Sequence, residues 1–175
     1  MSNIFDKLTK EDLIELAMLN NGRLFSKLPI KFKKLHPDAK APARATDWSA
    51  IWDLTALGFA YIDEEGEEFE TYPGIAKYRT GIAVEIPPGY VGLVFPRSSL
   101  FKTGMDLTNC VGVIDSDYRG EIAFVFRVVD IGKKYDIGYR IGQLVIIPCP
   151  AVEMVEVDEL SQTERGQGGF GSTGR

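Results

Sequence analysis

The chain has 175 residues, of which 45% are hydrophobic and 26% are charged, and these values fit one globular domain. Its formal net charge of −5 disfavours nucleic-acid binding through a generally basic surface. No apolar run approaches the roughly 20 residues of a membrane span, and the charged N-terminal region lacks the apolar core of a signal peptide.

The chain contains two cysteines, Cys110 and Cys149, and one histidine, His36. These residues do not provide the ligand set of a zinc site. We expect both cysteines to be small buried apolar residues in a reducing compartment, which indicates a cytoplasmic protein. His36 precedes a proline in a polar loop and is assigned no catalytic role.

One amphipathic helix is predicted near the N-terminus, over about residues 10–20. Residues 9–12 read Thr-Lys-Glu-Asp, a variant of the capping box, apolar residues follow at helical spacing, and Asn20-Asn21-Gly22 ends the pattern. This helix packs against the domain or a neighbouring subunit, or it binds a separate protein partner. The sequence leaves both readings open.

Strands are predicted between about residues 30 and 157, where short apolar runs alternate with turn residues. The first covers 29–35, two more lie within 80–96 around a Pro-Pro-Gly turn, and buried strands are predicted over 121–129 and 140–147. The acidic run at 63–68 predicts a solvated hairpin tip or loop. Because helical periodicity is confined to the N-terminus, the chain is predicted to be an all-β sandwich or jelly roll. Residues 1–28 would be an extension, 29–160 the β domain and 161–175 a glycine-rich tail.

Asp53 lies among large apolar residues within the segment 46–57. A buried carboxylate needs partners, because an unpaired charge is costly to remove from water. Asp53 is either a structural hydrogen-bond acceptor or part of a solvated ion site, and local sequence does not decide between these.

Two further segments carry groups suited to phosphate chemistry. Arg97-Ser98-Ser99 follows a predicted strand and can bind phosphate through charged and neutral hydrogen bonds. Residues 111–121 read as a β-hairpin that places Asp115 at the rim of a packed sheet. A carboxylate so placed can take a proton from water, although an aspartate in a turn also serves simply as a turn former.

The last eleven residues, 165–175, contain five glycines. They form a mobile terminus, an Arg-Gly-rich RNA-binding tail or a lid over a ligand. As a lid, the glycine-rich backbone would wrap an anion, Arg165 would pair with phosphate, and Phe170 would stack on a base.

Five segments taken together, in this order, resemble the motifs of the trimeric deoxyuridine triphosphatases (dUTPases). They are residues 49–54, 96–100, 112–121, 140–146 and 165–174, within a resemblance that covers roughly residues 30–175. The first motif departs from the family pattern, because Ile51 stands where a glycine is usual.

The resemblance implies a jelly roll that forms a homotrimer, with each active site built from three chains. It implies hydrolysis of dUTP to dUMP and pyrophosphate with Mg²⁺, which limits uracil in DNA and supplies dUMP for thymidylate synthesis. Magnesium would be bound mainly by the substrate's triphosphate and by waters, and Asp53 would contact it through water only.

The resemblance also assigns roles to individual residues. Asp115 would be the base and Arg97 a second catalytic residue. Tyr118 would pack on the deoxyribose and leave no room for a 2′-hydroxyl. The uracil edge would be read by Asn109, Gly112, Val113 and Ile114. The phosphates would be held by Arg97, Ser98, Ser99 and Gln143, and the lid would use Arg165, Phe170, Gly171, Ser172 and Thr173.

Two alternatives compete with this reading. The related dCTP deaminases share the fold and an Arg-Ser-Ser segment, but they need a glutamate on the strand after residue 121, and residues 122–126 contain no acid. A β-sandwich binding module that has kept the fold is the second alternative. A further protein partner could bind the N-terminal helix or the acidic segment 63–70 even in an active enzyme, whereas no nucleic-acid or membrane partner is expected.

Overall fold

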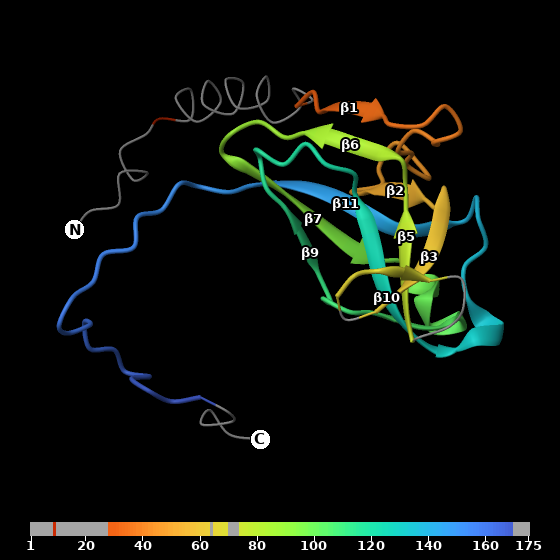
Figure 1. Cartoon of the computed structure of the whole chain (residues 1–175). Coiled ribbons are helices and arrows are strands. Elements are labelled where there is room, and N and C mark those ends of the chain that lie inside the picture. Colours follow the sequence, from red (N-terminus) through yellow and green to blue (C-terminus); the bar gives the residue numbers. More distant parts are fainter. Residues whose placement is uncertain (1–8, 10–27, 64, 70–73, 170–175) are drawn as a thin grey trace.

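The computed structural model describes Thr9 and residues 28–63, 65–69 and 74–169 (Figure 1). The predicted N-terminal helix over residues 10–20 lies outside these ranges. Within them the fold is all-β and every strand pairing is antiparallel. No helix among the described residues is long and apolar enough to cross a membrane.

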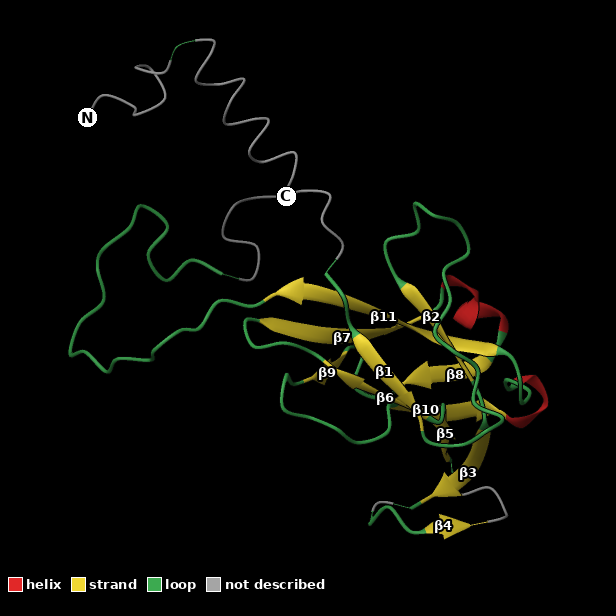
Figure 2. Cartoon of the chain, turned by 90° about the horizontal axis from the view of Figure 1, so that it is seen from above, coloured by secondary structure: helices red, strands yellow, loops and turns green. Residues whose placement is uncertain are grey.

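The described strands form two larger sheets and one small one (Figures 1 and 2). The five-stranded sheet has the order β4 (Glu68–Phe69), β3 (Gly58–Ile62), β5 (Ile75–Arg79), β10 (Ala123–Asp130), β8 (Gly104–Leu107). The four-stranded sheet has the order β2 (Trp52–Thr55), β11 (Arg140–Pro148), β7 (Tyr90–Pro96), β9 (Gly112–Ile114). The small sheet pairs β1 (Lys31–Lys34) with β6 (Ile82–Glu85), and two short 3₁₀ helices, η2 (Ser98–Lys102) and η3 (Ile131–Lys133), complete the described elements.

Most of the predicted strands are confirmed. The run 29–35 contains β1, the segment 80–96 contains β6 and β7, and the two buried strands are β10 and β11. The Pro-Pro-Gly turn is also present, with Gly89 at φ +83° and the Tyr90 amide donating to Pro87 over 3.2 Å. Of the acidic run, the described residues 63 and 65–67 lie between the paired strands β3 and β4, and Gly66 takes φ +86° there.

The core lies between the two larger sheets. Its largest fully buried side chains include Tyr78, Phe124 and Phe126 of the five-stranded sheet. Gly142 on β11 faces this layer so closely that a Cβ there would lie 2.0 Å from the Phe124 ring. The sheets therefore meet face to face, and a glycine makes room for an aromatic ring at the contact.

The predicted hairpin over residues 111–121 is wrong in its pairing. A turn is present, but β9 before it pairs with β7, whereas β10 after it pairs with β5 and β8. The chain crosses between sheets because Ile122 enters the core and its amide donates to Ile82 over 2.8 Å. Asp115 and Tyr118 consequently lie on a link between the sheets.

The prediction that both cysteines are buried is also wrong, because Cys110 and Cys149 are free and exposed. Cys110 lies in the turn after β8, where its backbone has a positive φ of 57°. Cys149 directly follows β11, where the chain leaves the sheets. Cys110 therefore lies in a turn and Cys149 at a strand end, and neither enters the core.

The chain after β11 runs away from the sheets as an extended arm, residues 149–169 (Figures 1 and 2). Strands were predicted as far as residue 157, but the last described strand ends at Pro148. The arm's apolar side chains are largely uncovered, at 55–92% exposure: Val152, Met154, Val155, Val157 and Leu160. An alternating apolar pattern is thus present without a strand partner in this chain.

Candidate active site

A pocket of about 270 Å³ lies beside the link between the sheets. Its walls come from β7, β8, β9, β10 and the turn after β9. It is lined by Val94, Leu107, Asn109, Gly112, Val113, Ile114, Asp115, Tyr118, Glu121, Ile122, Ala123 and Phe124. This set brings together the predicted base, the predicted sugar wall and the predicted uracil-reading residues.

Asp115 directly follows β9 and is exposed at this pocket. The turn behind it is closed by the Tyr118 amide, which donates to the Asp115 carbonyl over 3.2 Å. Arg119 stiffens the same turn by donating to the carbonyls of Ser116 and Tyr118 over 2.7 and 2.9 Å. The carboxylate is thus held on a braced turn and remains reachable by water.

Gly112 opens the floor of the pocket. A Cβ at this position would lie 2.5 Å from Val94 and 3.2 Å from the Asn109 side-chain amide. The glycine lets β9 approach β7 closely and leaves room for Asn109 beside the backbone. A flat ring that enters here would meet peptide groups and an amide, which carry both donors and acceptors.

Tyr118 forms another wall and is 43% exposed. Its hydroxyl donates to the Glu121 carbonyl over 3.0 Å, and its ring folds over Gly120, where a Cβ would lie 2.3 Å from the hydroxyl. A glycine after the turn is therefore what permits this ring position.

Asp53 is the centre of a second group. Its carboxylate is 5% exposed and accepts from Arg97 over 3.1 Å, from Arg140 over 2.9 Å and from Gln143 over 3.1 Å. Asp53 therefore acts as a hydrogen-bond acceptor, which is one of the two readings left open by the sequence. It joins β2, β11 and the residue after β7, so the carboxylate orients two arginines and one amide together.

Arg97 and Arg140 also line a cleft of about 550 Å³. The other lining residues are Ser99, Lys102, Thr103, Lys133, Lys134, Tyr135, Gly138 and Tyr139. This described lining contains five cationic side chains and no carboxylate, which suits a polyanionic ligand. Burial raises the pKa of Tyr135, so its hydroxyl stays neutral beside these cations.

Sequence reasoning assigned no role to Arg140, Lys133, Lys134 or Tyr135. Arg140 was within reach of prediction, because a buried aspartate requires a cationic partner. Lys133 at the end of η3 and Lys134 after it gave no local signal, since a pair of lysines in a turn reads as ordinary surface.

The two groups do not share a pocket within one chain. Gly112 pairs with Val94 of β7, and Gln143 of β11 lies between Phe95 and Asp53. Two strands thus separate β2 from β9, which amounts to three spacings of about 4.8 Å, or roughly 14 Å. The described lining of the Asp115 pocket contains no lysine or arginine.

The beginning of the predicted lid is described, and Arg165 is exposed there. Its guanidinium donates to the Gly168 carbonyl over 2.9 Å within the tail itself. The remaining predicted lid residues, Phe170, Gly171, Ser172 and Thr173, lie outside the described ranges.

Candidate metal ligands are sparse where the structure describes the chain. Residues 28–63, 65–69 and 74–169 contain no cluster of three or more His, Cys, Asp or Glu side chains that could hold a metal ion. Both oxygens of Asp53 are already engaged by nitrogen donors. A cation bound at this site would take most of its oxygen ligands from a substrate and from water.

Comparison with known families gives one match that spans most of the chain. A family model described as dUTPase matches residues 37–174. The deoxyuridine 5′-triphosphate nucleotidohydrolase of Nautilia profundicola is 43% identical over 152 residues, which cover 85% of this chain and 100% of that protein. The enzyme of the same name from Hydrogenobaculum sp. is 41% identical over 146 residues, covering 81% and 95%.

Solved structures give the same answer. The Staphylococcus bacteriophage 80alpha dUTPase with dUPNHPP aligns with a TM-score of 0.68 and 28% identity, covering 85% of this chain and 100% of that one. A dUTPase from phage phi11 of S. aureus, solved to show how a structural Mg(II) ion is coordinated, aligns with a TM-score of 0.63 and 23% identity, covering 77% and 100%. The second similarity concerns the fold alone.

Proposed function

This chain belongs to the dUTPase family, and we propose that it hydrolyses dUTP to dUMP and pyrophosphate at the Asp115 pocket. The deoxyuridine would occupy the pocket, and the triphosphate would extend from it to arginines such as those grouped at Asp53. One observation carries the assignment: a cavity of about 270 Å³ has Asp115 at its rim and the backbone of Gly112 at its floor, and its described lining contains no lysine or arginine.

The chemistry follows from where Asp115 stands. The carboxylate accepts a proton from a water molecule, and the water oxygen attacks the α-phosphorus. A new oxygen–phosphorus bond forms while the bond to the bridging oxygen breaks, and pyrophosphate leaves. The products are dUMP, which retains the deoxyribose, and pyrophosphate.

Base and sugar selection would come from the pocket walls. Backbone groups near Gly112, Val113 and Ile114, together with Asn109, would bind the uracil edge. A closely fitted slot rejects a 5-methyl group by contact and cytosine by mismatched donors and acceptors. Tyr118 would pack against the deoxyribose and occupy the space that a 2′-hydroxyl needs.

The phosphates would be held by charge and by hydroxyls. Arg97, Ser98, Ser99 and Gln143 are the proposed phosphate-binding residues, with Arg97 also stabilising the developing charge as a second catalytic residue. Arg165, Phe170, Gly171, Ser172 and Thr173 would close over the bound nucleotide. Asp53 would act on this set by orienting Arg97 and Gln143.

Magnesium is the proposed cofactor. It would be bound chiefly by triphosphate oxygens and waters, with Asp53 in contact through water only, and it would neutralise phosphate charge. The small number of carboxylates near the described site fits this mode of binding.

We further propose a homotrimer with shared sites. In one chain the described lining of the Asp115 pocket contains no lysine or arginine, and Asp53, which binds Arg97, lies on β2, with two strands between it and β9. A neighbouring copy could supply the missing cations, and the uncovered apolar arm 149–169 offers a surface for contact between copies. Both features support assembly.

The remaining assignments extend the family comparison. We propose a jelly roll over residues 29–160, preceded by a helical extension over 1–28 and followed by a lid over 161–175. Two exposed, unpaired cysteines fit a reducing intracellular compartment such as the cytoplasm. The helix and the acidic segment remain candidates for a second protein contact.

Pyrophosphate release tests the proposed reaction directly. The full chain with Mg²⁺ should release pyrophosphate from dUTP much faster than from dTTP, dCTP or UTP. Equal rates of pyrophosphate release from all four nucleotides would contradict the proposal that this pocket selects uracil and deoxyribose. Ammonia release from dCTP would instead indicate the deaminase.

A further inference from the structure

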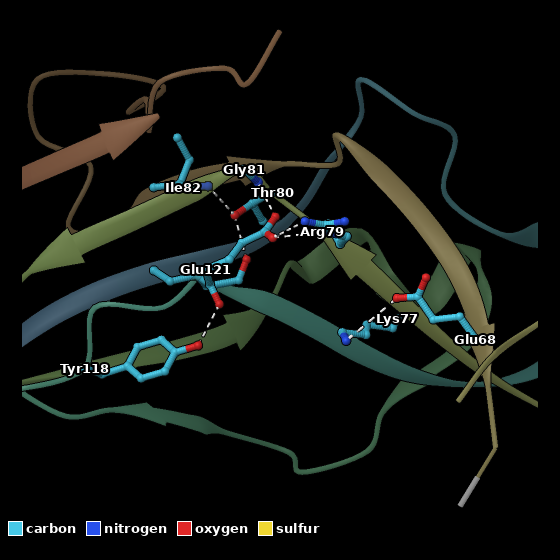
Figure 3. Close-up of polar contacts among 9 residues, drawn as sticks. Glu68, Lys77, Arg79, Thr80, Gly81, Ile82, Tyr118 and Glu121 are labelled. Carbon is cyan, nitrogen blue, oxygen red and sulfur yellow. Dashed lines mark hydrogen bonds and ion pairs between the residues drawn. The ribbon is translucent and has the colours of Figure 1, made fainter. Parts of the chain in front are cut away.

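The residue after the Tyr118 turn, Glu121, has no role in the mechanism above, yet its side chain is only 16% exposed. One carboxylate oxygen accepts from the Gly81 amide over 2.6 Å, and the other accepts from Arg79 Nε over 3.0 Å (Figure 3). Arg79 Nη2 also lies 3.0 Å from that second oxygen. Glu121 thus binds the turn between β5 and β6 with both oxygens.

The backbone of the same residue faces the active-site pocket. The Glu121 carbonyl receives the Tyr118 hydroxyl over 3.0 Å, as Figure 3 shows. One residue therefore contacts the β5–β6 turn through its carboxylate and the sugar wall through its carbonyl. It also lines both the Asp115 pocket and a neighbouring cleft beside Arg79 and Gly81.

The next residue is held to the same turn. Thr80 donates through its hydroxyl to the Ile122 carbonyl over 2.6 Å, and the Ile122 amide donates to Ile82 over 2.8 Å. Thr80 is fully buried, so these bonds are shielded from water. The link between the sheets is consequently fixed at residues 121 and 122, immediately after the turn that carries Asp115 and Tyr118.

We propose that Glu121 is a positioning residue for Tyr118 and thereby sets how strongly the site rejects a ribonucleotide. Its carboxylate holds the carbonyl that receives the Tyr118 hydroxyl, so the ring stands at a fixed distance from the sugar. Without the carboxylate, the Gly81 amide loses its acceptor and Arg79 loses its partner. The peptide at 121 then gains freedom, and the ring can withdraw from the space of a 2′-hydroxyl. This inference rests on the proposed function of the Asp115 pocket.

The test compares kcat and KM for dUTP and UTP in the full chain and four variants: Glu121→Gln, Glu121→Ala, Tyr118→Phe and the double variant Tyr118→Phe/Glu121→Gln. We expect Glu121→Ala to lower the preference for dUTP over UTP about 5–10-fold, the scale of one hydrogen bond. KM should change more than kcat, because Asp115 keeps its place. Glu121→Gln should have a smaller effect, since its amide oxygen can still accept from Gly81.

The double variant decides how Glu121 acts. If Glu121 works through the Tyr118 hydroxyl, the Gln substitution adds nothing to selectivity once Tyr118 is phenylalanine. Effects that multiply in the double variant would overturn the inference. Lys77→Ala is the control, because Lys77 lies on β5, as Arg79 does, but pairs with Glu68 over 3.9 Å, away from Tyr118 (Figure 3). A selectivity loss in Lys77→Ala equal to that in Glu121→Gln would also overturn it.

A readout without nucleotide separates this inference from the proposed reaction. In protein labelled with ¹³C at tyrosine Cζ, the Tyr118 resonance is identified by its loss in Tyr118→Phe. It should shift in Glu121→Gln and stay in place in Lys77→Ala, whether or not the chain hydrolyses dUTP. An unchanged resonance in folded Glu121→Gln would contradict the inference even if dUTP hydrolysis is confirmed.

Discussion

Two aspartates of the proposed site, Asp115 and Asp53, lie in different environments. Asp115 is exposed on a braced turn, where water can reach its carboxylate. Asp53 is buried and shared by three donors, so it acts as a scaffold for cations. The same residue type thus has two uses, set by burial and by partners.

Asp115→Asn should retain nucleotide binding and lose turnover, because an amide keeps the shape of the side chain but cannot take the proton. We expect kcat to fall about 10²–10⁴-fold. Single-turnover kinetics and binding of a non-hydrolysable deoxyuridine nucleotide measure the two effects separately. Asp117→Asn, in the same turn but outside the pocket lining, is the control; near-normal kcat in Asp115→Asn would exclude it as the base.

Tyr78 gives a prediction about alkaline pH. Burial raises its pKa to about 12, whereas an unfolded tyrosine titrates near 10. Below pH ~10 both states are neutral and this residue contributes no pH dependence. Between pH ~10 and ~12 only the unfolded chain loses the proton, so the stabilisation is lost as the pH rises.

Urea unfolding of the natural chain and of Tyr78→Phe at pH 8 and pH 11 measures this contribution. The natural chain should lose about 1.4 kcal/mol more than Tyr78→Phe between these pH values, because pH 11 is about one unit above the pKa of the unfolded tyrosine. At pH 8 the variant should be less stable, because the Tyr135 carbonyl loses the hydrogen bond that it receives over 2.9 Å. Identical pH dependence in both proteins would contradict the assignment.

The strands illustrate what local sequence can and cannot predict. β6, β7, β10 and β11 were predictable because apolar residues, β-branched residues and turn glycines coincide there. Which strands pair with one another could not be predicted. Residues 111–121 have the sequence pattern of a hairpin, yet β9 and β10 belong to different sheets. Pairing depends on Ile122 reaching the core beside Ile82, which lies far away in sequence.

The candidate site shows the same division. Asp115, Arg97 and Tyr118 could be chosen from their motifs, whereas the three donors around Asp53 come from positions 44 to 90 residues away. Cys110 and Cys149 were predicted to be buried because a free cysteine usually behaves as a small apolar residue. Their exposure follows from a turn and a strand end, which are features of the whole fold.

The close contact between Gly142 and Phe124, on facing sheets, leads to a prediction about stability. Gly142→Ala would place a Cβ 2.0 Å from the buried Phe124 ring, so either the ring or β11 must move. Overpacking of this kind costs about 1–3 kcal/mol, and Gln143 next to it would be displaced from Asp53. The thermal unfolding midpoint should fall and the KM for dUTP should rise.

Gly58→Ala is the matched control for this substitution. It also adds one methyl to a strand glycine, but no atom lies within 4 Å of the added Cβ. Its stability should stay within about 0.5 kcal/mol of the natural chain. Equal losses in the two variants would show that backbone propensity, and not the Phe124 contact, sets the cost.

At the scale of the whole molecule, the tail should matter for activity and little for folding. Residues 165–169 make their described hydrogen bonds within the tail, so the sheets lose no contact when it is removed. A chain ending at residue 164 should keep its thermal unfolding midpoint and its assembly state while dUTP hydrolysis falls sharply. A chain ending at residue 169 separates Arg165 from the final six residues, and full activity in the shorter truncation would exclude a lid.

The described lining of the Asp115 pocket contains no lysine or arginine, and this has a consequence for how the enzyme responds to dilution. A monomer would still bind a neutral deoxynucleoside, because the shape and the peptide groups of the pocket are enough to bind it. It would bind the phosphate chain weakly, because the described lining has no cation. Specific activity should therefore decline as the protein concentration drops below the subunit dissociation constant, while weak deoxyuridine binding persists. Full catalytic activity would then require the association of subunits.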